Sequence, residues 1–185
     1  PFIWQFQQDD GTTFIDPDPY REPDFQFDIS DNYETIYPRF TNMVKNLKTF
    51  VRENPKVMSA LQRYTGFTKQ QILNHLTFGQ GPVVKVVEMN GRFGYYEKNT
   101  NSNTLYIRAS YVRGLELASL ESTQEATAFL LAVTILHEYV HFGTAQNNIS
   151  TGVYDFGYGF ERDAFNVIVD ADNAGKVVLK FSKYF

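Results

Sequence analysis

The sequence contains no cysteine, and only three of its 185 residues are histidine. The absence of cysteine excludes disulfide bonds and thiolate metal ligands, and it leaves the cellular compartment open. No apolar run reaches the roughly 18 residues of a transmembrane helix, so we expect no membrane span. The net charge of −4 gives no case for nucleic-acid binding. Hydrophobic residues make up 43% of the chain, which predicts a globular domain.

The N-terminal part of the chain is strongly acidic. It begins without a basic segment or an initiator methionine, so we expect a mature piece of a longer protein. Residues 1–34 hold nine acidic residues against one arginine, a net charge of −8 that leaves +4 on residues 35–185. We predict an arm or linker over 1–34 and one domain over 35–185. The arm is either a solvated linker or a cover over the domain's site. Its anchors as a cover would be Trp4, Phe6, Phe14, Phe25 and Phe27.

Helical patterns occupy the first part of the domain. Apolar residues recur at helical spacing over residues 37–53, which predicts an amphipathic helix. Pro55 suits the first turn of a second helix, which Gly66 should end. Thr68 is a candidate N-cap for a third, short helix. This third helix carries His75, for which we expect a core or surface role rather than a catalytic one.

Strand patterns follow. Residues 83–88 are rich in valine, and Asn90-Gly91 is a strong hairpin signal that predicts pairing with a return strand over 93–97. A third strand is predicted over 104–108. A long helix of about 24 residues should then begin near Ser122 or Thr123, followed by a loop and further helical patterns. The pattern predicts an α+β domain with a small, mostly antiparallel sheet.

The chemistry is concentrated in residues 136–142, which read LHEYVHF. Positions four apart lie on one face of a helix, so His137 and His141 can direct both rings at one metal ion. Glu138 is rotated by about 100° from His137, so it cannot be an equivalent ligand but can reach water bound to the metal. Neutral imidazoles leave Zn²⁺ a Lewis acid, and the carboxylate can take a proton from the attacking water. This pattern predicts a zinc peptidase with Glu138 as general base.

A catalytic zinc needs a third protein ligand. The extended motif HExxHxxGxxH fails, because threonine and asparagine stand at its glycine and last histidine. Glu161 follows His141 after 19 intervening residues, a spacing that resembles the thermolysin-like zincins, whose third ligand is a glutamate on a following helix. The resemblance to this glutamate-zincin (gluzincin) class implies one Zn²⁺ held by His137, His141 and Glu161. Asp155 stays open as an alternative ligand for a hard ion or as a brace for a histidine.

The chain also resembles the metallopeptidase toxin domains at the C-termini of bacterial polymorphic toxins, over about residues 40–170. The resemblance implies a zincin-like fold, with N-terminal helices, a small sheet, the long HExxH helix and a following helix that carries the glutamate. It also implies a secreted protein or one delivered into a target cell, with a cognate immunity protein. The segments that carry it are Asn54-Pro55, Tyr64-Thr65-Gly66, Ile72-Leu73, Phe78-Gly79-Gln80-Gly81-Pro82, the HExxH motif and the D-x-G-x-x-F-E run.

Further site residues are expected around this core. Tyr154 or Tyr158 would donate a hydrogen bond to the tetrahedral intermediate, unless both only pack in their loop. Asp155 or Asp163 would orient a ligand histidine through its second ring nitrogen. In zincins the strand before the active helix runs antiparallel to bound substrate, so the resemblance implies an edge strand that pairs with substrate backbone. Its residues would be Leu105, Tyr106, Ile107, Arg108 and Ala109.

Three functions compete. The first is a zinc-dependent endopeptidase that acts on a protein or peptide as a secreted bacterial toxin or effector. The second is a catalytically silent zincin-fold binding module of a larger surface or secreted protein. The third is a metal-free structural or interaction domain. The presence of Glu138 favours the first over the second, because a module that does not cleave has no need of a general base.

Overall fold

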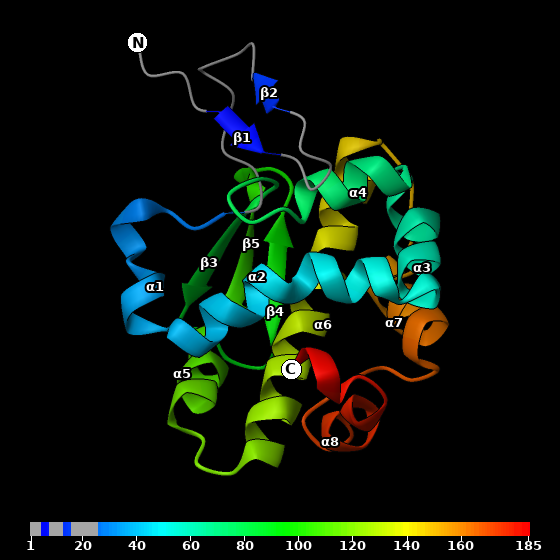
Figure 1. Ribbon diagram of the computed structural model, residues 1–185. Helices are drawn as coiled ribbons and strands as arrows, with labels where there is room; N and C mark the ends of the chain where they lie inside the picture. The colour runs from blue at the N-terminus through cyan, green and yellow to red at the C-terminus, as the bar shows by residue number, and fades with distance from the viewer. Residues whose placement is uncertain (1–4, 8–12, 16–25) are drawn as a thin grey trace.

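The computed structural model describes residues 5–7, 13–15 and 26–185, and it confirms an α+β fold (Figure 1). The helices are α1 (Tyr33–Ile36), α2 (Pro38–Glu53), α3 (Pro55–Thr65), α4 (Lys69–His75), α5 (Ala109–Leu117), α6 (Glu121–Gln146), α7 (Phe156–Phe165) and α8 (Ala174–Val177). Short 3-10 turns are η1 (Ile29–Asp31), η2 (Val178–Lys180) and η3 (Ser182–Tyr184). The strands are β1 (Gln5–Gln7), β2 (Thr13–Ile15), β3 (Val83–Val87), β4 (Gly94–Glu97) and β5 (Asn101–Arg108).

The first helices begin and end where local sequence signals predict. Pro55 occupies the first turn of α3, and Gly66 ends that helix in a left-handed conformation. The Thr68 side chain accepts a hydrogen bond from the Gln71 backbone N–H, and the Gln71 side-chain oxygen accepts one from the Thr68 backbone N–H. This reciprocal capping box satisfies backbone donors that would otherwise be unpaired at the start of α4.

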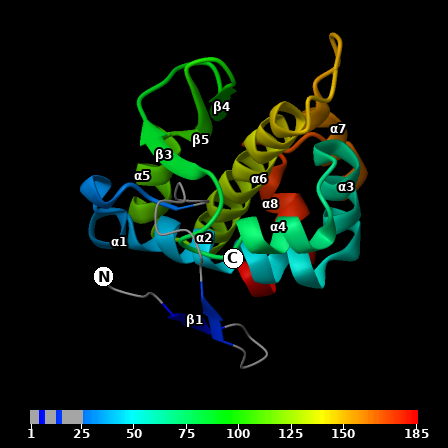
Figure 2. The ribbon, with the colours of Figure 1, turned by 90° about the horizontal axis from the view of Figure 1, so that it is seen from above.

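Helix α6 is the centre of the domain. In Figure 2 the strands β3 to β5 lie on one side of α6, and α3, α7 and α8 lie on the other. Its length and composition would suffice to cross a membrane, but 78% of its apolar window is buried inside the domain. A helix that is apolar on nearly all sides is expected at the core of a domain, where it has neighbours on every face. His75 packs against α6, and its Nδ1 is 2.6 Å from the hydroxyl of Tyr139, a buried residue of that helix.

The sheet differs from the predicted one. The strand order is β3-β5-β4, with β3 parallel and β4 antiparallel to β5, so the sheet is mixed. The predicted hairpin of β3 and β4 through Asn90-Gly91 is wrong, because β5 lies between those two strands. Gly91 still takes a positive φ of 75°, so the local turn forms. Leu105 and Ile107 of β5 are fully buried, and the central position of β5 places these two side chains in the core.

The described end of the acidic arm belongs to the core packing. The Phe27 ring contacts Tyr33, Phe40 and Phe78 at centroid distances of 5.0, 5.9 and 5.4 Å. The backbone of Gln26 pairs with Pro82 and Val84 at the start of β3. Phe27 is therefore a core anchor rather than a cover over a site. The division at residue 34 stays a prediction, and four of the proposed anchors lie outside the side chains that the structure describes: Trp4, Phe6, Phe14 and Phe25.

Candidate metal centre

The two motif histidines lie one turn apart on α6. Their rings are 5.0 Å apart between centroids, and their side chains are 13% and 29% exposed for His137 and His141. From Ala128 to Thr144 every residue of α6 except these two histidines is buried, so packing fixes the backbone that carries them. The two imidazoles face a common point, because one carboxylate oxygen lies near a nitrogen of each ring.

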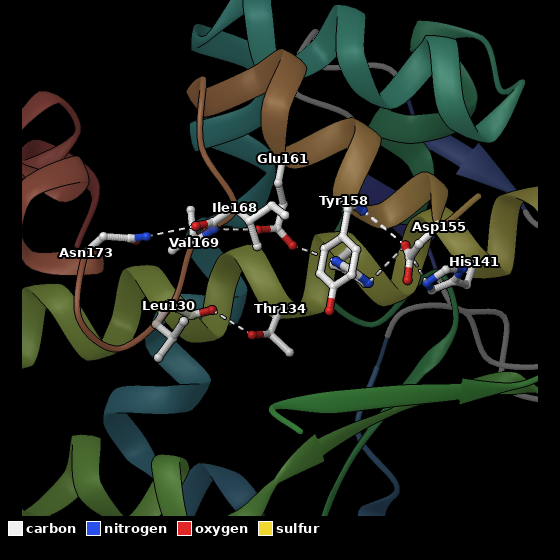
Figure 3. A network of polar contacts seen from close by, with 10 residues as sticks. Leu130, Thr134, His141, Asp155, Tyr158, Glu161, Ile168, Val169 and Asn173 are labelled. Carbon is white, nitrogen blue, oxygen red and sulfur yellow. Dashed lines mark hydrogen bonds and ion pairs between the residues drawn. The ribbon is translucent and has the colours of Figure 1, made fainter. Parts of the chain in front are cut away.

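That oxygen belongs to Asp155. Its Oδ1 lies 3.5 Å from Nε2 of His137 and 3.5 Å from Nε2 of His141 (Figure 3). Ligand atoms about 2.0 to 2.1 Å from a tetrahedral zinc lie roughly 3.3 to 3.4 Å from one another. The three donor atoms all fall within 4.8 Å of each other, so they fit around one small cation. Among the described residues, this cluster is His137, His141 and Asp155 rather than the predicted set with Glu161.

Glu161 lies on the opposite side of the His137 ring. Its Oε1 is 2.6 Å from Nδ1 of His137, and its Oε2 accepts a hydrogen bond from the backbone N–H of Val169 at 2.6 Å. Asn173 holds the same loop by donating to the carbonyl of Ile168, as Figure 3 shows. Both oxygens of this 4%-exposed carboxylate are thus engaged away from Nε2. In this geometry Glu161 has the orienting position that was predicted for Asp155, and Asp155 has the position that was predicted for Glu161.

Helix α7 begins at Phe156, and this start decides the position of Asp155. Asp155 is the N-cap of α7, where its Oδ1 accepts the backbone N–H of Tyr158 at 3.1 Å. The first turn then lies against His137, because a Cβ on Gly157 would stand 2.4 Å from the imidazole ring. Real Cβ contacts do not occur at that distance, so a glycine is required here. The sequence signal for this helix start is Asp155 itself, because aspartate is a preferred N-cap residue and Gly157 follows it two positions later.

Glu138 points into the same region and is only 6% exposed. Burial raises the pKa of Glu138 to about 7, while the positive charge of His137 opposes that shift. Burial alone would lower the pKa of His137, but its bond to Glu161 and the charges of Glu138, Glu161 and Asp155 raise it. Burial and the charge of His137 lower the pKa of His141. The carboxylates around the two rings make this a place that favours a cation.

The other predicted site residues separate into near and far ones. The Tyr158 ring packs edge-on against His137 at a centroid distance of 5.0 Å, and burial raises the pKa of its phenol. Tyr154 instead contacts Phe156 and does not line the cleft described below. Asp163 forms an ion pair with Arg63 at 2.9 Å and does not contact a motif histidine, so its predicted orienting role is wrong.

An open cleft of about 950 Å³ runs over the histidines. The wall opposite α7 is formed mainly by β4, an edge strand of the sheet, and β5 contributes only its last residue, Arg108. The predicted substrate strand Leu105–Ala109 is wrong as an edge, because β5 is paired on both sides and Ala109 already begins α5. Gly94 of β4 lies against Glu138, since a Cβ at this position would be 3.2 Å from Cγ of Glu138. Sequence reasoning predicted this strand over 93–97 but not its position at the cleft, because a period-2 pattern does not reveal a strand's neighbours.

The centre thus combines two imidazoles and a carboxylate around one point, a second carboxylate beside that point, and an open cleft with a free strand edge. These are the parts of a metal-dependent hydrolase site of the peptidase class. The family described as Metallopeptidase toxin 3 matches residues 33–166, which is most of the chain. The chain belongs to this metallopeptidase toxin family, as the sequence resemblance predicted. No curated protein and no solved structure matches it.

Proposed function

We propose that the domain is a zinc-dependent endopeptidase whose metal is held by His137, His141 and Asp155. The supporting observation is the pair of equal 3.5 Å distances from Asp155 Oδ1 to the two Nε2 atoms, in a cleft that the buried Glu138 also lines. Two nitrogens and one carboxylate oxygen suit Zn²⁺, which keeps a fourth position open in catalytic sites. When bound, the ion supplies Lewis acidity to a peptide carbonyl and to water.

The chain's own residues account for the proton transfers. Glu138 takes a proton from the attacking water and delivers it to the amine that leaves when the peptide bond breaks. Glu161 accepts the Nδ1–H of His137, which fixes the tautomer and leaves Nε2 free to bind metal. The free edge of β4 can pair with the backbone of an extended peptide and hold it across the site.

Metal content tests this proposal directly. We expect about one zinc per chain in protein purified without a histidine tag, and its loss in His141→Ala, because two remaining ligands bind zinc weakly. Plasma mass spectrometry on both proteins gives the answer. Wild-type protein that stays metal-free after incubation with zinc would exclude the peptidase and favour a structural domain.

Tyr158 is the proposed donor to the oxyanion that develops on the peptide carbonyl. Its ring lies against His137, and its phenol is protonated at neutral pH, because burial raises a pKa that is ordinarily about 10. We expect Tyr158→Phe to lower kcat roughly a hundredfold, as loss of one oxyanion donor does elsewhere, with zinc content unchanged. The matched control is Tyr154→Phe, outside the cleft, which should keep wild-type kcat. Equal kcat in both variants and the wild type would remove Tyr158 from the mechanism.

We further propose that the domain acts as a toxin, as the C-terminal part of a larger bacterial protein that is secreted or delivered into a target cell. Family membership supports this proposal. A peptidase that cleaves proteins inside a cell endangers the cell that makes it, so a cognate immunity protein would be its partner. The alternative, a silent zincin-fold binding module, is disfavoured by the buried Glu138 beside the metal ligands.

A further inference from the structure

The cleft carries uncommitted positive charge on its sheet side. Arg92 precedes β4, Lys98 follows it, and Arg108 ends β5, and all three line the cleft. We name these three residues the basic wall. It faces α7, which carries the acidic residues Asp155 and Glu161. The cleft is therefore polarised across its width.

None of the three basic residues forms an ion pair with a carboxylate in the described part of the chain. Arg92 lies 5.3 Å over the ring of Tyr95, and Arg108 lies 5.4 Å over the ring of Tyr111. Stacking on an aromatic ring orients a guanidinium, and its N–H donors, which lie in the plane of the guanidinium, stay available to a ligand. The Nε of Arg108 is buried without a hydrogen-bond partner.

Apart from Glu138, which serves the proposed proton transfer, the acidic groups of the cleft have local partners. Glu161 bonds to His137 and to the Val169 backbone, and Asp170 accepts the backbone N–H groups of residues 172 and 173. Asp155 caps α7 and faces both histidines. The charges left for a ligand are therefore positive ones, and they suit an anion.

The position of the basic wall relative to Glu138 indicates which part of a bound substrate it would contact. Gly94 of β4 lies against Glu138, and Arg92 precedes Gly94 by two residues. Two residues of chain span at most about 7 Å, so the Arg92 backbone lies within roughly 7 Å of Gly94. A peptide paired with β4 would bring to Arg92 a group about two residues from the scissile bond.

We propose that the basic wall selects substrates by a carboxylate within about two residues of the scissile bond, with Arg92 as the principal contact. This inference rests on the proposed peptidase function. A guanidinium fork matches a carboxylate through two parallel hydrogen bonds, which neutral amides and hydroxyls do not reproduce. The carboxylate comes either from an Asp or Glu side chain or from the end of the substrate chain.

Peptide profiling tests the proposal and separates the two sources. The zinc-loaded full chain is incubated with a mixed peptide library, once with free and once with amidated C-termini, and cleavages are read by mass spectrometry. We expect Asp and Glu to be enriched near the cleaved bond in both libraries. Enrichment that vanishes on amidation would identify the terminal carboxylate instead. The absence of any acidic preference would overturn the proposal.

Variants connect the preference to the wall. Arg92→Gln should lower the ratio of rates on matched Asp and Asn peptides on the order of tenfold or more, the size of a charged hydrogen bond. Arg92→Glu should turn the preference towards Lys and Arg, and raised ionic strength should weaken the wild-type preference. Arg63 is an exposed arginine outside the cleft, so Arg63→Gln should keep the wild-type preference for acidic peptides. An unchanged ratio in Arg92→Gln would refute the role of this residue.

A binding measurement distinguishes failure of this inference from failure of the peptidase proposal. Zinc-loaded Glu138→Gln protein is titrated with fluorescent Asp-containing peptides and with their Asn counterparts. Tighter binding of the acidic peptides, lost in Glu138→Gln/Arg92→Gln, supports the basic wall even when the wild type cleaves nothing. Equal or absent binding of the two sets overturns it, whatever the cleavage result.

Discussion

Replacing Glu138 with glutamine is expected to leave zinc content at the wild-type level and to lower peptide hydrolysis by about 10²- to 10⁴-fold. Glutamine has nearly the same shape but cannot accept the proton of the attacking water. Glu138 does not belong to the cluster of donor atoms, so its loss removes no ligand. Zinc content and kcat on a fluorogenic peptide, measured on the same preparation, test both halves of this expectation. Cleavage at the wild-type rate would rule out Glu138 as general base.

The stability of the metal-free protein provides the control for folding. Burial raises the pKa of Glu138 to about 7, above its ordinary value of 4.5. Folding therefore disfavours the ionised carboxylate, and this cost grows as the pH rises from the ordinary pKa to the folded one and persists above it. Glutamine removes the cost, so Tm at pH 8 in the presence of chelator should be equal to or higher than that of the wild type. A lower Tm would attribute lost activity to misfolding.

The same pair of proteins tests the toxin proposal. Cells that produce the wild-type domain in the compartment of its target should stop growing, and cells that produce Glu138→Gln at the same level should not. Equal inhibition by both proteins would separate toxicity from peptide hydrolysis. Absence of inhibition by the wild type in both cytoplasm and periplasm would favour the binding-module alternative.

The second large effect distinguishes the two carboxylates of α7. We expect Asp155→Asn to weaken zinc binding more than Glu161→Gln, for which a loss of about 10- to 100-fold is typical of a residue that orients a ligand. The reason is that Asp155 faces Nε2 of both histidines, whereas Glu161 contacts only Nδ1 of His137. Competition with a zinc chelator gives both affinities. The reverse order would return the third-ligand role to Glu161.

The choice of asparagine keeps this comparison free of helix effects. Asp155 caps α7, and alanine at an N-cap costs about 0.5 to 2 kcal/mol, whereas asparagine caps as well as aspartate. Thermal unfolding without metal should therefore be similar for the wild type and Asp155→Asn. Asp163→Asn serves as the control, because Asp163 pairs with the exposed Arg63 and lies outside the cleft, so this variant should keep wild-type zinc affinity.

Local signals explain which parts of the fold the sequence predicts well. Helices α2, α3 and α4 are specified by apolar spacing, by Pro55 at a first turn and by the cap at Thr68, all of which act within a few residues. Helix α6 follows from its long apolar pattern. The sheet was predicted less well, because pairing joins distant segments and a turn signal at Asn90-Gly91 specifies a reversal but no partner.

Within the site, the sequence alone determined the residues on one helix. His137, Glu138 and His141 needed only the 3.6-residue period to be assigned a common function. The tertiary structure decided what surrounds them: Asp155 rather than Glu161 faces Nε2, and β4 rather than β5 forms the edge of the cleft. Both outcomes depend on how α7 and the sheet pack against α6. Spacing along the chain limits what can reach the metal, and only packing selects which oxygen and which strand do so.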